Sequence, residues 1–426
     1  MQQKLTDFDQ ALLNGEFGPA AQMAMHILVR MLPIFGAERF LDIEGAHIDS
    51  TVYQGIATME YAEKLASLGA KVRVPSTLNV SGVDEHGWRE WAVPPEHAQN
   101  AYRQMVAYQS MGCIPTWTCA PYQTEHRPTF GQQIAWGESN AISFANSVIG
   151  ARTLRYPDLL DICAAIAGRA PAAGLHLTEN RAGEIVLHLQ NISTSLQEND
   201  AFYPVLGHIL GKIAGERIPV IDGMSVQPND DQLKALCAAA ASSGAVAMFH
   251  MVGITPEAPT LTDALQQHKP LLIQKVTMDD VRSARNELST TDDDKLDLVV
   301  LGSPHFSLAE FQKLMPLLSG CHRHEKTKFL VTTSRGVAML AKKMHMLEKL
   351  QDFGGQLTVD TCILTSPMLP GEIKTLMTNS AKFAYYAPGL LGTQVVYGSL
   401  EDCVNSAVAG RMVRDDSLWQ DAKGAM

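Results

Sequence analysis

The 426-residue sequence has no cluster of basic side chains and no apolar run long enough to cross a membrane. Acidic residues outnumber lysine and arginine 45 to 34, and the formal net charge is −11. Nucleic acids and anionic membranes bind clustered Lys and Arg, so this charge balance excludes both as expected partners. The chain begins without a basic segment followed by an apolar one, and no stretch reaches about 18 apolar residues. We therefore expect neither a signal peptide nor a transmembrane helix.

The chain also lacks a disulfide framework and the common catalytic motifs. Its seven cysteines are an odd number, spread without a Cys-x-x-Cys pair, which predicts reduced thiols and a cytoplasmic protein. No Gly-x-Gly-x-x-Gly follows an expected strand, and there is no Walker loop, His-Glu-x-x-His or Gly-x-Ser-x-Gly. These absences argue against nucleotide cofactors and the common hydrolase mechanisms.

What the sequence does contain is typical of a globular α/β protein. Hydrophobic residues make up 46% and charged residues 19%, which is ample for a core. A chain of this length usually forms two or three domains, because single cores stop growing near about 250–300 residues. We expect an N-terminal α/β region over 1–225, a parallel α/β domain over 226–355 and a C-terminal segment over 356–426.

The first half of the chain predicts helices separated by short strands. Helical spacing favours helices over 7–14 and 19–32, with Thr6 or Asp7 as the first cap and Pro19 opening the second. The further elements that we expect are a strand at 40–43, a loop at 44–50, a helix at 59–68, a strand at 71–74 and a loop at 75–81. The stretch 112–174 is irregular, and long irregular stretches inside a compact domain tend to be functional.

In the second half, strands and helices alternate. Apolar, β-rich runs predict strands at 245–252, 296–301, 328–332 and 356–359, and helical patterns fall at 308–318 and 336–350. Such alternation predicts an α/β/α fold with parallel strands covered on both faces. Ligands of such sheets bind at the carboxyl ends of strands. Two segments follow such ends, Gly302–His305 and Asp360–Cys362.

Two cysteines are candidates for chemistry rather than packing. Cys119 lies in an irregular, aromatic-rich loop, and Cys362 directly follows a predicted strand. Either could be a metal ligand or a nucleophile, and the alternative for each is a buried cysteine that only packs. Cys163, Cys237 and Cys403 fall within helical patterns and are expected core thiols, while Cys113 and Cys321 are undecided.

Three further segments carry polar groups that suit a small ligand. Gly137–Ala141 opens a helix, where Ser139 or Asn140 can be the N-cap or the helix N-terminus can bind a carboxylate. Glu138 could then bind an amine or transfer a proton. Lys382, among small polar and aromatic residues, fits an anion-binding lysine, and its alternative is a solvated surface charge. His47 with Asp49, and Asn79, are either structural hydrogen-bonding groups or site residues.

Taken in order, several of these segments resemble the aconitase X family, and the resemblance runs from about residue 5 to 412. The segments that carry it are Thr-Leu-Asn-Val (77–80), Thr-Cys-Ala-Pro-Tyr (118–122), Trp-Gly-Glu-Ser-Asn-Ala (136–141), Leu-Gly-Ser-Pro-His-Phe (301–306), Asp-Thr-Cys (360–362) and Thr-Asn-Ser-Ala-Lys-Phe (378–383).

The resemblance implies an iron–sulfur dehydratase with an aconitase-like, multi-domain α/β/α fold. Some members of the family are cis-3-hydroxy-L-proline dehydratases and others are mevalonate 5-phosphate dehydratases. The family exists as one fused chain or as a large and a small subunit, and the small unit is a swivelling domain that carries a serine base. This chain resembles a large subunit that lacks the swivelling domain, so we expect a separate small partner chain.

The resemblance also assigns residues. Cys119 and Cys362 correspond to cluster ligands, but the third cysteine of the family is replaced by Ser303, a poorer iron ligand than a thiolate. A [4Fe–4S]-derived cluster, a [2Fe–2S] cluster, a mononuclear metal, and help from His305 or Cys113 all remain open. Glu138, Ser139 and Lys382 correspond to catalytic positions. The substrate-facing positions are Gly45, Ala46, His47, Asn79, Glu138, Ser139 and Lys382.

The loop at 44–49 bears on the substrate. Glu44 and Asp49 are acidic, and acidic groups repel phosphate but suit a cationic imino group. This favours dehydration of cis-3-hydroxy-L-proline to a pyrroline-2-carboxylate. The alternatives are a mevalonate 5-phosphate dehydratase, a hydroxyproline racemase or epimerase, and a catalytically silent relative with a binding role.

Overall fold

The computed structural model describes residues 3–420, and the chain forms two compact units. Among the described residues, the first unit runs to Ala182 and also takes in Asp360–Pro367. The second unit contains Gly183–Val359 and continues from Met368. One short segment of the first unit therefore lies, in sequence, inside the second.

This division differs from the expected boundary at 225/226. Strand β6 (Ile185–Leu189) pairs in parallel with both β7 (Pro219–Asp222) and β9 (Leu272–Val276). A boundary at 225 would separate β6 and β7 from β9 and divide one hydrogen-bonded sheet. The ladder, which the sequence does not reveal, places these strands in a single unit.

The first unit opens with two helices that confirm the predicted ones. Helix α1 (Asp7–Leu13) is capped by Thr6, whose side chain accepts a hydrogen bond from Asp9 N while the Asp9 carboxylate accepts one from Thr6 N. Helix α2 (Pro19–Met31) has its proline at the first position. The buried Asp9 carboxylate also accepts a hydrogen bond from Arg169 Nε at 2.8 Å, which joins α1 to the rest of the unit.

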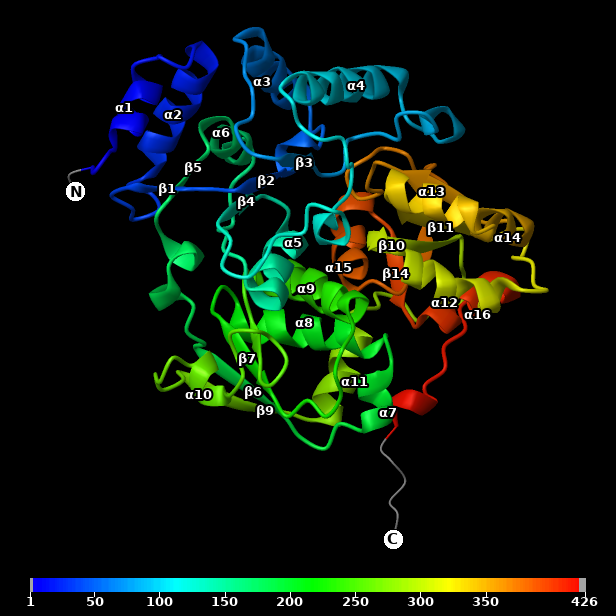
Figure 1. The fold of residues 1–426 in the computed structure, drawn as a ribbon. Coiled ribbons are helices and arrows are strands. Elements are labelled where there is room, and N and C mark those ends of the chain that lie inside the picture. Colours follow the sequence, from blue (N-terminus) through cyan, green and yellow to red (C-terminus); the bar gives the residue numbers. More distant parts are fainter. Residues whose placement is uncertain (1–2, 421–426) are drawn as a thin grey trace. The chain divides into compact units, whose positions relative to one another are not determined.

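A parallel three-stranded sheet organises the first unit, with β2 between β3 and β4 (Figure 1). Its strands are β2 (Gly45–Ile48), β3 (Ser76–Leu78) and β4 (Ile134–Trp136). Its main helices are α3 (Ile56–Ser67), α4 (Pro95–Ser110), α5 (Ser139–Phe144) and α6 (Leu160–Ala167). A separate antiparallel pair joins β1 (Phe40–Asp42) and β5 (Arg169–Pro171).

Three of the predictions for this region are wrong. The expected loop at 44–50 contains β2, and the expected loop at 75–81 contains β3. The expected strand at 71–74 does not form. Val72 N donates to Met111 O and Arg73 N donates to Ala165 O, so this stretch bonds to two different segments instead of joining one ladder.

The second unit contains two parallel sheets. The first has the strand order β8-β7-β6-β9, where β8 is His250–Met251. Its helices are α7 (Thr194–Glu198), α8 (Phe202–Ala214), α9 (Asp230–Gly244), α10 (Leu261–Ala264) and α11 (Met278–Glu287). Of the predicted strand at 245–252, only His250–Met251 forms a strand, β8.

The second sheet of this unit has five parallel strands in the order β12-β11-β10-β13-β14. They are β10 (Leu298–Phe306), β11 (Lys328–Thr333), β12 (Gln356–Val359), β13 (Thr375–Thr378) and β14 (Gln394–Tyr397). Helices α12 (Leu308–Leu318), α14 (Met346–Phe353) and α16 (Leu400–Ala409) share a core with one face of it. Helix α15 (Ala381–Leu391) packs between this sheet and α9. The predicted parallel α/β arrangement is confirmed.

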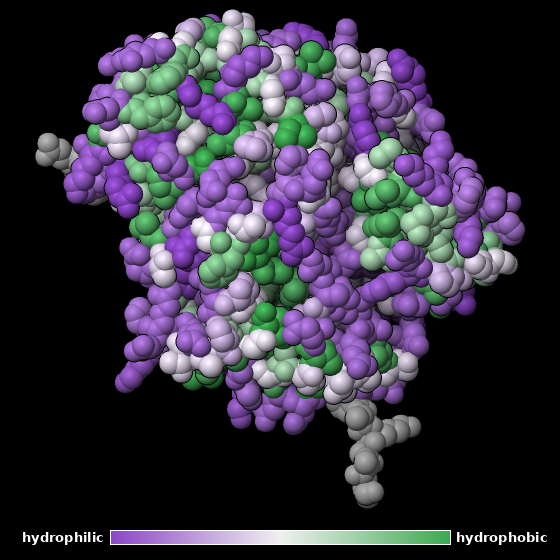
Figure 2. Space-filling view, viewed as in Figure 1, coloured by the Kyte–Doolittle hydropathy of each residue, from purple (hydrophilic) through white to green (hydrophobic). Residues whose placement is uncertain are grey.

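The predicted helix at 336–350 is two helices. Helix α13 (Arg335–Lys343) ends before His345, whose backbone φ is +57°, and α14 then begins. Met339 and Met344 expose 57% and 47% of their surface. Figure 2 shows apolar surface in the region where Figure 1 labels α13. Helix α13 thus uses only part of its apolar stripe for packing.

No helix within residues 3–420 combines the length and the hydropathy needed to cross a bilayer. The longest described helices are interrupted by polar side chains, as expected for helices with one packed face.

Helices α8 and α9 pack at glycines. A Cβ on Gly244 would lie 1.8 Å from Gly211 O, and one on Gly211 would lie 2.7 Å from Ala240 O. Real side chains do not approach backbone this closely, so the contact requires residues without a Cβ. This contact fixes α9, which carries the polar residues Asp231 and Lys234.

Replacing Gly211 by alanine should lower the free energy of unfolding by about 1–3 kcal/mol, because the added methyl overpacks the helix contact. The thermal midpoint measures the loss. Gly336→Ala, in α13, is the matched control: nothing lies within 4 Å of the added Cβ, so it should be neutral or stabilising by up to about 1 kcal/mol. Equal midpoints for the two variants would contradict the close contact.

Candidate functional site

Three polar side chains follow the three parallel strands of the first unit. Asp49 follows β2, Asn79 follows β3, and Glu138 lies two residues after β4. Because parallel strands end at the same edge of a sheet, these residues gather there. The Asn79 side-chain amide donates a hydrogen bond to the Asp49 carboxylate. Asp49, which the sequence left as structural or functional, thus lies beside two of the predicted site residues.

The strand edge is rich in carboxyl groups. Asp49 N donates to Asp161 Oδ2 at 2.6 Å, and Ser50 N donates to the same oxygen at 3.1 Å. Although part of its surface stays accessible, protein surrounds the Asp49 carboxyl, and this burial, with the charge of Glu138, raises its pKa well above the usual range. Burial also raises the pKa of Asp161, to about 6. The site therefore tolerates neutral carboxyl groups and disfavours anions.

His47 is buried at the end of β2. Its Nδ1 lies 2.8 Å from Thr77 Oγ1 on β3, and its ring lies 5.8 Å from that of Trp136 on β4. Burial lowers the pKa of His47 to about 3, so the ring stays neutral near pH 7. Within residues 3–420, His47 Nε2 and Asn79 Oδ1 are among the buried side-chain atoms that form no hydrogen bond of normal geometry, although Asn79 and the Thr118 backbone lie close enough to His47 to act on its pKa. Buried polar atoms without a partner are uncommon and mark places where a ligand or water completes the bonding.

Glu138 is the N-cap of α5. Its Oε2 accepts a hydrogen bond from Ala141 N at 2.8 Å and another from the Asn140 side chain. The expectation that Ser139 or Asn140 caps this helix is wrong, because the helix already begins at Ser139. Asn140 also donates to Cys119 O at 2.9 Å. One side chain thus connects the capping carboxylate to the backbone of a candidate ligand.

Cys119 and Cys362 lie together in the first unit. Cys119 packs with Val52 and Val80, and the half-buried Cys362 packs against the same cluster. The Cys362 segment is held there by Ser81 N, which donates to Asp360 O at 2.7 Å. Two residues more than 240 apart in sequence therefore meet beside the strand edge that carries Asn79.

The donor chemistry of this pair fits a thiophilic metal centre. Both cysteines are thiols outside disulfides, and thiolates are the usual ligands of iron–sulfur clusters. No three His, Cys, Asp or Glu side chains within residues 3–420 form a group able to hold a metal ion.

The remaining cysteines have packing roles or no assigned role. Cys163, Cys237 and Cys403 are buried in α6, α9 and α16, which confirms them as core thiols. Cys113 is also buried, and this burial raises the pKa of its thiol, so the neutral form is favoured. Cys321 is half-buried.

Ser303 and Lys382 belong to the second unit. Strand β10 continues through Phe306, so Ser303 and His305 lie in its last part. The prediction that they lie in a loop after the strand is therefore wrong. Lys382 lies in the first turn of α15, whose N-cap is Ser380. A cavity of about 380 Å³ in this unit is lined by Ser303, Pro304, Asn379, Ser380, Lys234 and Glu310, among others.

Three family models match the chain in succession. They are described as aconitase X first domain (residues 2–179), aconitase X second domain (183–286) and aconitase X third domain (296–409). A crystal structure of aconitase X from Thermococcus kodakaraensis, in its holo-form, is similar, with a TM-score of 0.84 and 32% identity. The match covers 95% of this chain and 100% of that one.

Curated relatives carry two names. Cis-3-hydroxy-L-proline dehydratase of Pseudomonas aeruginosa is 46% identical over 419 residues, which are 98% of this chain and 72% of the relative. The Hypocrea jecorina protein of the same name is 43% identical, over 96% of this chain and 69% of the relative. The phosphomevalonate dehydratase large subunit of Methanothermobacter thermautotrophicus is 39% identical, over 91% of this chain and 95% of the relative.

The neutral, buried His47 predicts acid lability. The unfolded imidazole has a pKa near 6.5, so the stabilising contribution of the neutral ring is fully present above about pH 6.5 and is lost as pH falls towards 3. His47→Gln should reduce the slope of unfolding free energy against pH by about 1.4 kcal/mol per pH unit between pH 6 and 4. Urea unfolding across this range measures it.

His86→Gln is the control for this measurement, because the His86 side chain is 77% exposed. It should leave the slope unchanged. If the slope of unfolding free energy against pH in His47→Gln equals that of the wild type, His47 is already protonated in the folded protein and the prediction is wrong.

Proposed function

Because the chain belongs to the aconitase X family, a family with named dehydratases, we propose that it is the large part of a hydro-lyase acting on cis-3-hydroxy-L-proline. The product would be a pyrroline-2-carboxylate. Two relatives named for this reaction are 46% and 43% identical, against 39% for the phosphomevalonate dehydratase subunit described above. The observation that carries the proposal to this substrate is the carboxyl-rich strand edge of the first unit.

The electrostatics of that edge favour a cation over a phosphate. Asp49, Glu138 and Asp161 gather there, and burial favours the neutral form of Asp49 and Asp161, so that ionising them without a cationic partner costs free energy. A phosphate dianion needs positive charge or several free backbone N–H groups. The ring nitrogen of hydroxyproline is a secondary ammonium, and a buried carboxyl group gains by pairing with it.

Dehydration has two difficulties, a weakly acidic α proton and a poor leaving group. We assign the carboxylate of the substrate to Lys382, because an ammonium in the first turn of α15 attracts anions and stabilises the charge that develops when the α proton leaves. Glu138 and Ser139 are assigned to substrate binding and proton handling at the N-terminus of α5. Gly45, Ala46, His47 and Asn79 are assigned to substrate binding.

An iron–sulfur group is the cofactor that the donor chemistry supports. Cys119 and Cys362 would hold it, and Ser303 is the proposed third ligand. When bound, such a group supplies Lewis acidity for loss of the hydroxyl. The neighbouring carboxyl groups and the neutral His47 would then orient the substrate and exclude other anions.

A small partner chain is also part of the proposal. The relatives named phosphomevalonate dehydratase large subunit match over almost their whole length, 95% for one from Methanothermobacter thermautotrophicus and 98% for one from Methanosarcina mazei. Their name implies a small subunit, and we propose a corresponding cytoplasmic partner for this chain.

The substrate assignment is tested with the complex of this chain and its small partner, prepared without air. With cis-3-hydroxy-L-proline, the imine product should form, because the carboxyl groups pair with the ring ammonium. Mevalonate 5-phosphate should react at least 100-fold more slowly. Product analysis by mass spectrometry and chiral chromatography measures both water loss and any change of configuration.

Other outcomes name the competing functions. Faster dehydration of mevalonate 5-phosphate would replace the proposed substrate, and the similarity to the large subunits of that enzyme is the observation in favour of it. Inversion of configuration without water loss would mean an epimerase. No reaction in an iron-free, folded complex would mean a silent relative.

The ligand assignment is tested by single replacements. Cys119→Ser and Cys362→Ser should each lower bound iron by roughly tenfold or more, because each removes a thiolate donor. Cys321→Ser, half-buried in the second unit, is the matched control and should keep full iron. Metal analysis and visible absorption measure the effect, and unchanged iron in both cysteine variants would contradict the assignment.

A further inference from the structure

The last part of β10 leaves the regular sheet. Its register with β11 shifts between Leu301 and Phe306, and we call Gly302–Phe306, which contains this shift and ends at the paired Phe306, the bulged segment. Gly302 has a φ of +96°, and a Cβ there would lie 2.0 Å from Thr332 O. Only glycine fits this position. The segment carries Ser303, the proposed third ligand.

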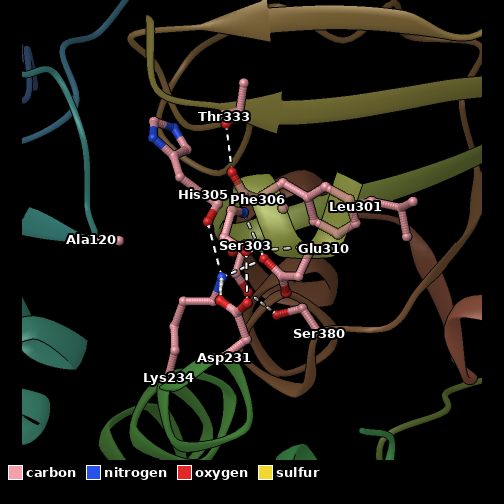
Figure 3. A network of polar contacts seen from close by, with 12 residues as sticks. Ala120, Asp231, Lys234, Leu301, Ser303, His305, Phe306, Glu310, Thr333 and Ser380 are labelled. Atoms are coloured by element: carbon pink, nitrogen blue, oxygen red, sulfur yellow. Dashed lines mark hydrogen bonds and ion pairs between the residues drawn. The ribbon is translucent and has the colours of Figure 1, made fainter. Parts of the chain in front are cut away.

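Side chains from three other elements bind the carbonyl groups of this segment. Thr332 Oγ1 donates to Gly302 O at 2.6 Å, and Thr333 Oγ1 donates to Phe306 O at 2.6 Å. The Ser380 hydroxyl, at the N-cap of α15, donates to Ser303 O. Lys234 Nζ, from α9, donates to His305 O at 3.2 Å. Figure 3 shows Lys234 and Ser380 reaching this segment from separate helices.

Lys234 differs from the other three donors because it brings a charge into the interior. Its side chain is 1% exposed and forms ion pairs with Asp231, at 2.9 Å, and with Glu310. Burial alone would lower the pKa of Lys234, but the two carboxylates raise it above its ordinary value, so the ammonium persists. We call Lys234, Asp231 and Glu310 the buried triad.

The triad also fixes the residue that follows the segment. Ser307 N donates to Glu310 Oε2 at 2.7 Å, and Ser307 Oγ donates to Asp231 Oδ2 at 2.7 Å. Both carboxylates therefore hold the start of α12 while they neutralise the lysine. A buried ion pair contributes little net stability compared with apolar residues of the same size, so stability alone gives no reason for a charged anchor here.

Resting on the proposed function, we propose that Lys234 is a positioning residue that fixes the backbone at His305 and thereby aims the Ser303 side chain. The ammonium does not touch the substrate or the reacting atoms in this assignment. It acts through the His305 carbonyl, and the carboxylates of Asp231 and Glu310 keep it charged and aligned. A ligand side chain needs such support to hold its geometry within fractions of an ångström.

The test removes the charge without leaving an unpaired one. Lys234→Met combined with Asp231→Asn and Glu310→Gln keeps side-chain size and the hydrogen bonds to Ser307 but deletes the ammonium. Lys234→Met alone is a second variant, which leaves two buried carboxylates. Lys313→Met is the matched control, because Lys313 lines the same cavity but forms a half-exposed ion pair with Asp200.

The first readout needs no metal. Hydrogen–deuterium exchange of the peptide covering 302–306 in iron-free protein should become at least tenfold faster in the triple variant. Exchange in β11 should stay within twofold of the wild-type rate, as should exchange of the 302–306 peptide in Lys313→Met. Exchange of that peptide within twofold of wild type in the triple variant overturns the proposal.

The second readout is the bound iron. The reconstituted triple variant should hold at least fivefold less iron than wild type, or give an electron paramagnetic resonance spectrum that matches Ser303→Ala. A lower melting temperature with wild-type iron content and an unchanged spectrum overturns the positioning role. If the wild-type complex itself binds no iron, the proposed function fails, and the exchange measurement still decides whether Lys234 fixes this segment.

Discussion

The parallel pairing of β2 with both β3 and β4 is the constraint on which the first unit depends. Because all three strands run the same way, the residues after them gather at one edge, although they lie some 30 to 90 positions apart in the chain. Asp49, Asn79 and Glu138 owe their proximity to this pairing. The two cysteines meet beside the same edge because Val80, which directly follows Asn79, packs with both of them, and Ser81 N donates a hydrogen bond to Asp360 O, two residues before Cys362.

Charge shapes the chemistry of both units in opposite ways. At the strand edge of the first unit, carboxyl groups crowd together, and burial pushes the pKa of Asp49 and Asp161 upward. In the second unit, two carboxylates surround one ammonium, and the pKa of Lys234 rises instead. In our proposal the first arrangement gains from a substrate cation, whereas in the second the lysine already has its two carboxylate partners.

The sequence predicts the elements whose signal is local. Helix α1 has its capping residues, and strands β11 and β12 have apolar runs bounded by helices. Strands β2 and β3 escape prediction because they are only three or four residues long and contain Gly, His, Ser and Thr. Their conformation comes from neighbours in the sheet, which no local pattern encodes.

In the candidate site, the residues that stand in distinctive local segments were likewise predictable, whereas those whose role depends on distant contacts were not. Cys119, Cys362 and Glu138 stand in distinctive segments, and the structure brings the two cysteines together as neighbours. Asp161 had no signal, because its role at Asp49 N depends on a contact across 112 residues. Lys234 had none either, since a lysine within a helical pattern reads as a surface charge.

The segment Asp360–Pro367 has a consequence for biosynthesis. It completes the first unit, yet the ribosome makes it after most of the second unit, including β10, β11 and β12. Domains generally fold in order from the N-terminus as the chain emerges. Until this segment is made, the cluster around Cys119 lacks Cys362, so any group that needs both cysteines can bind only after strands β10, β11 and β12 have been synthesised. Assembly of the proposed centre would thus follow the synthesis of most strands of the second unit, from β6 to β12.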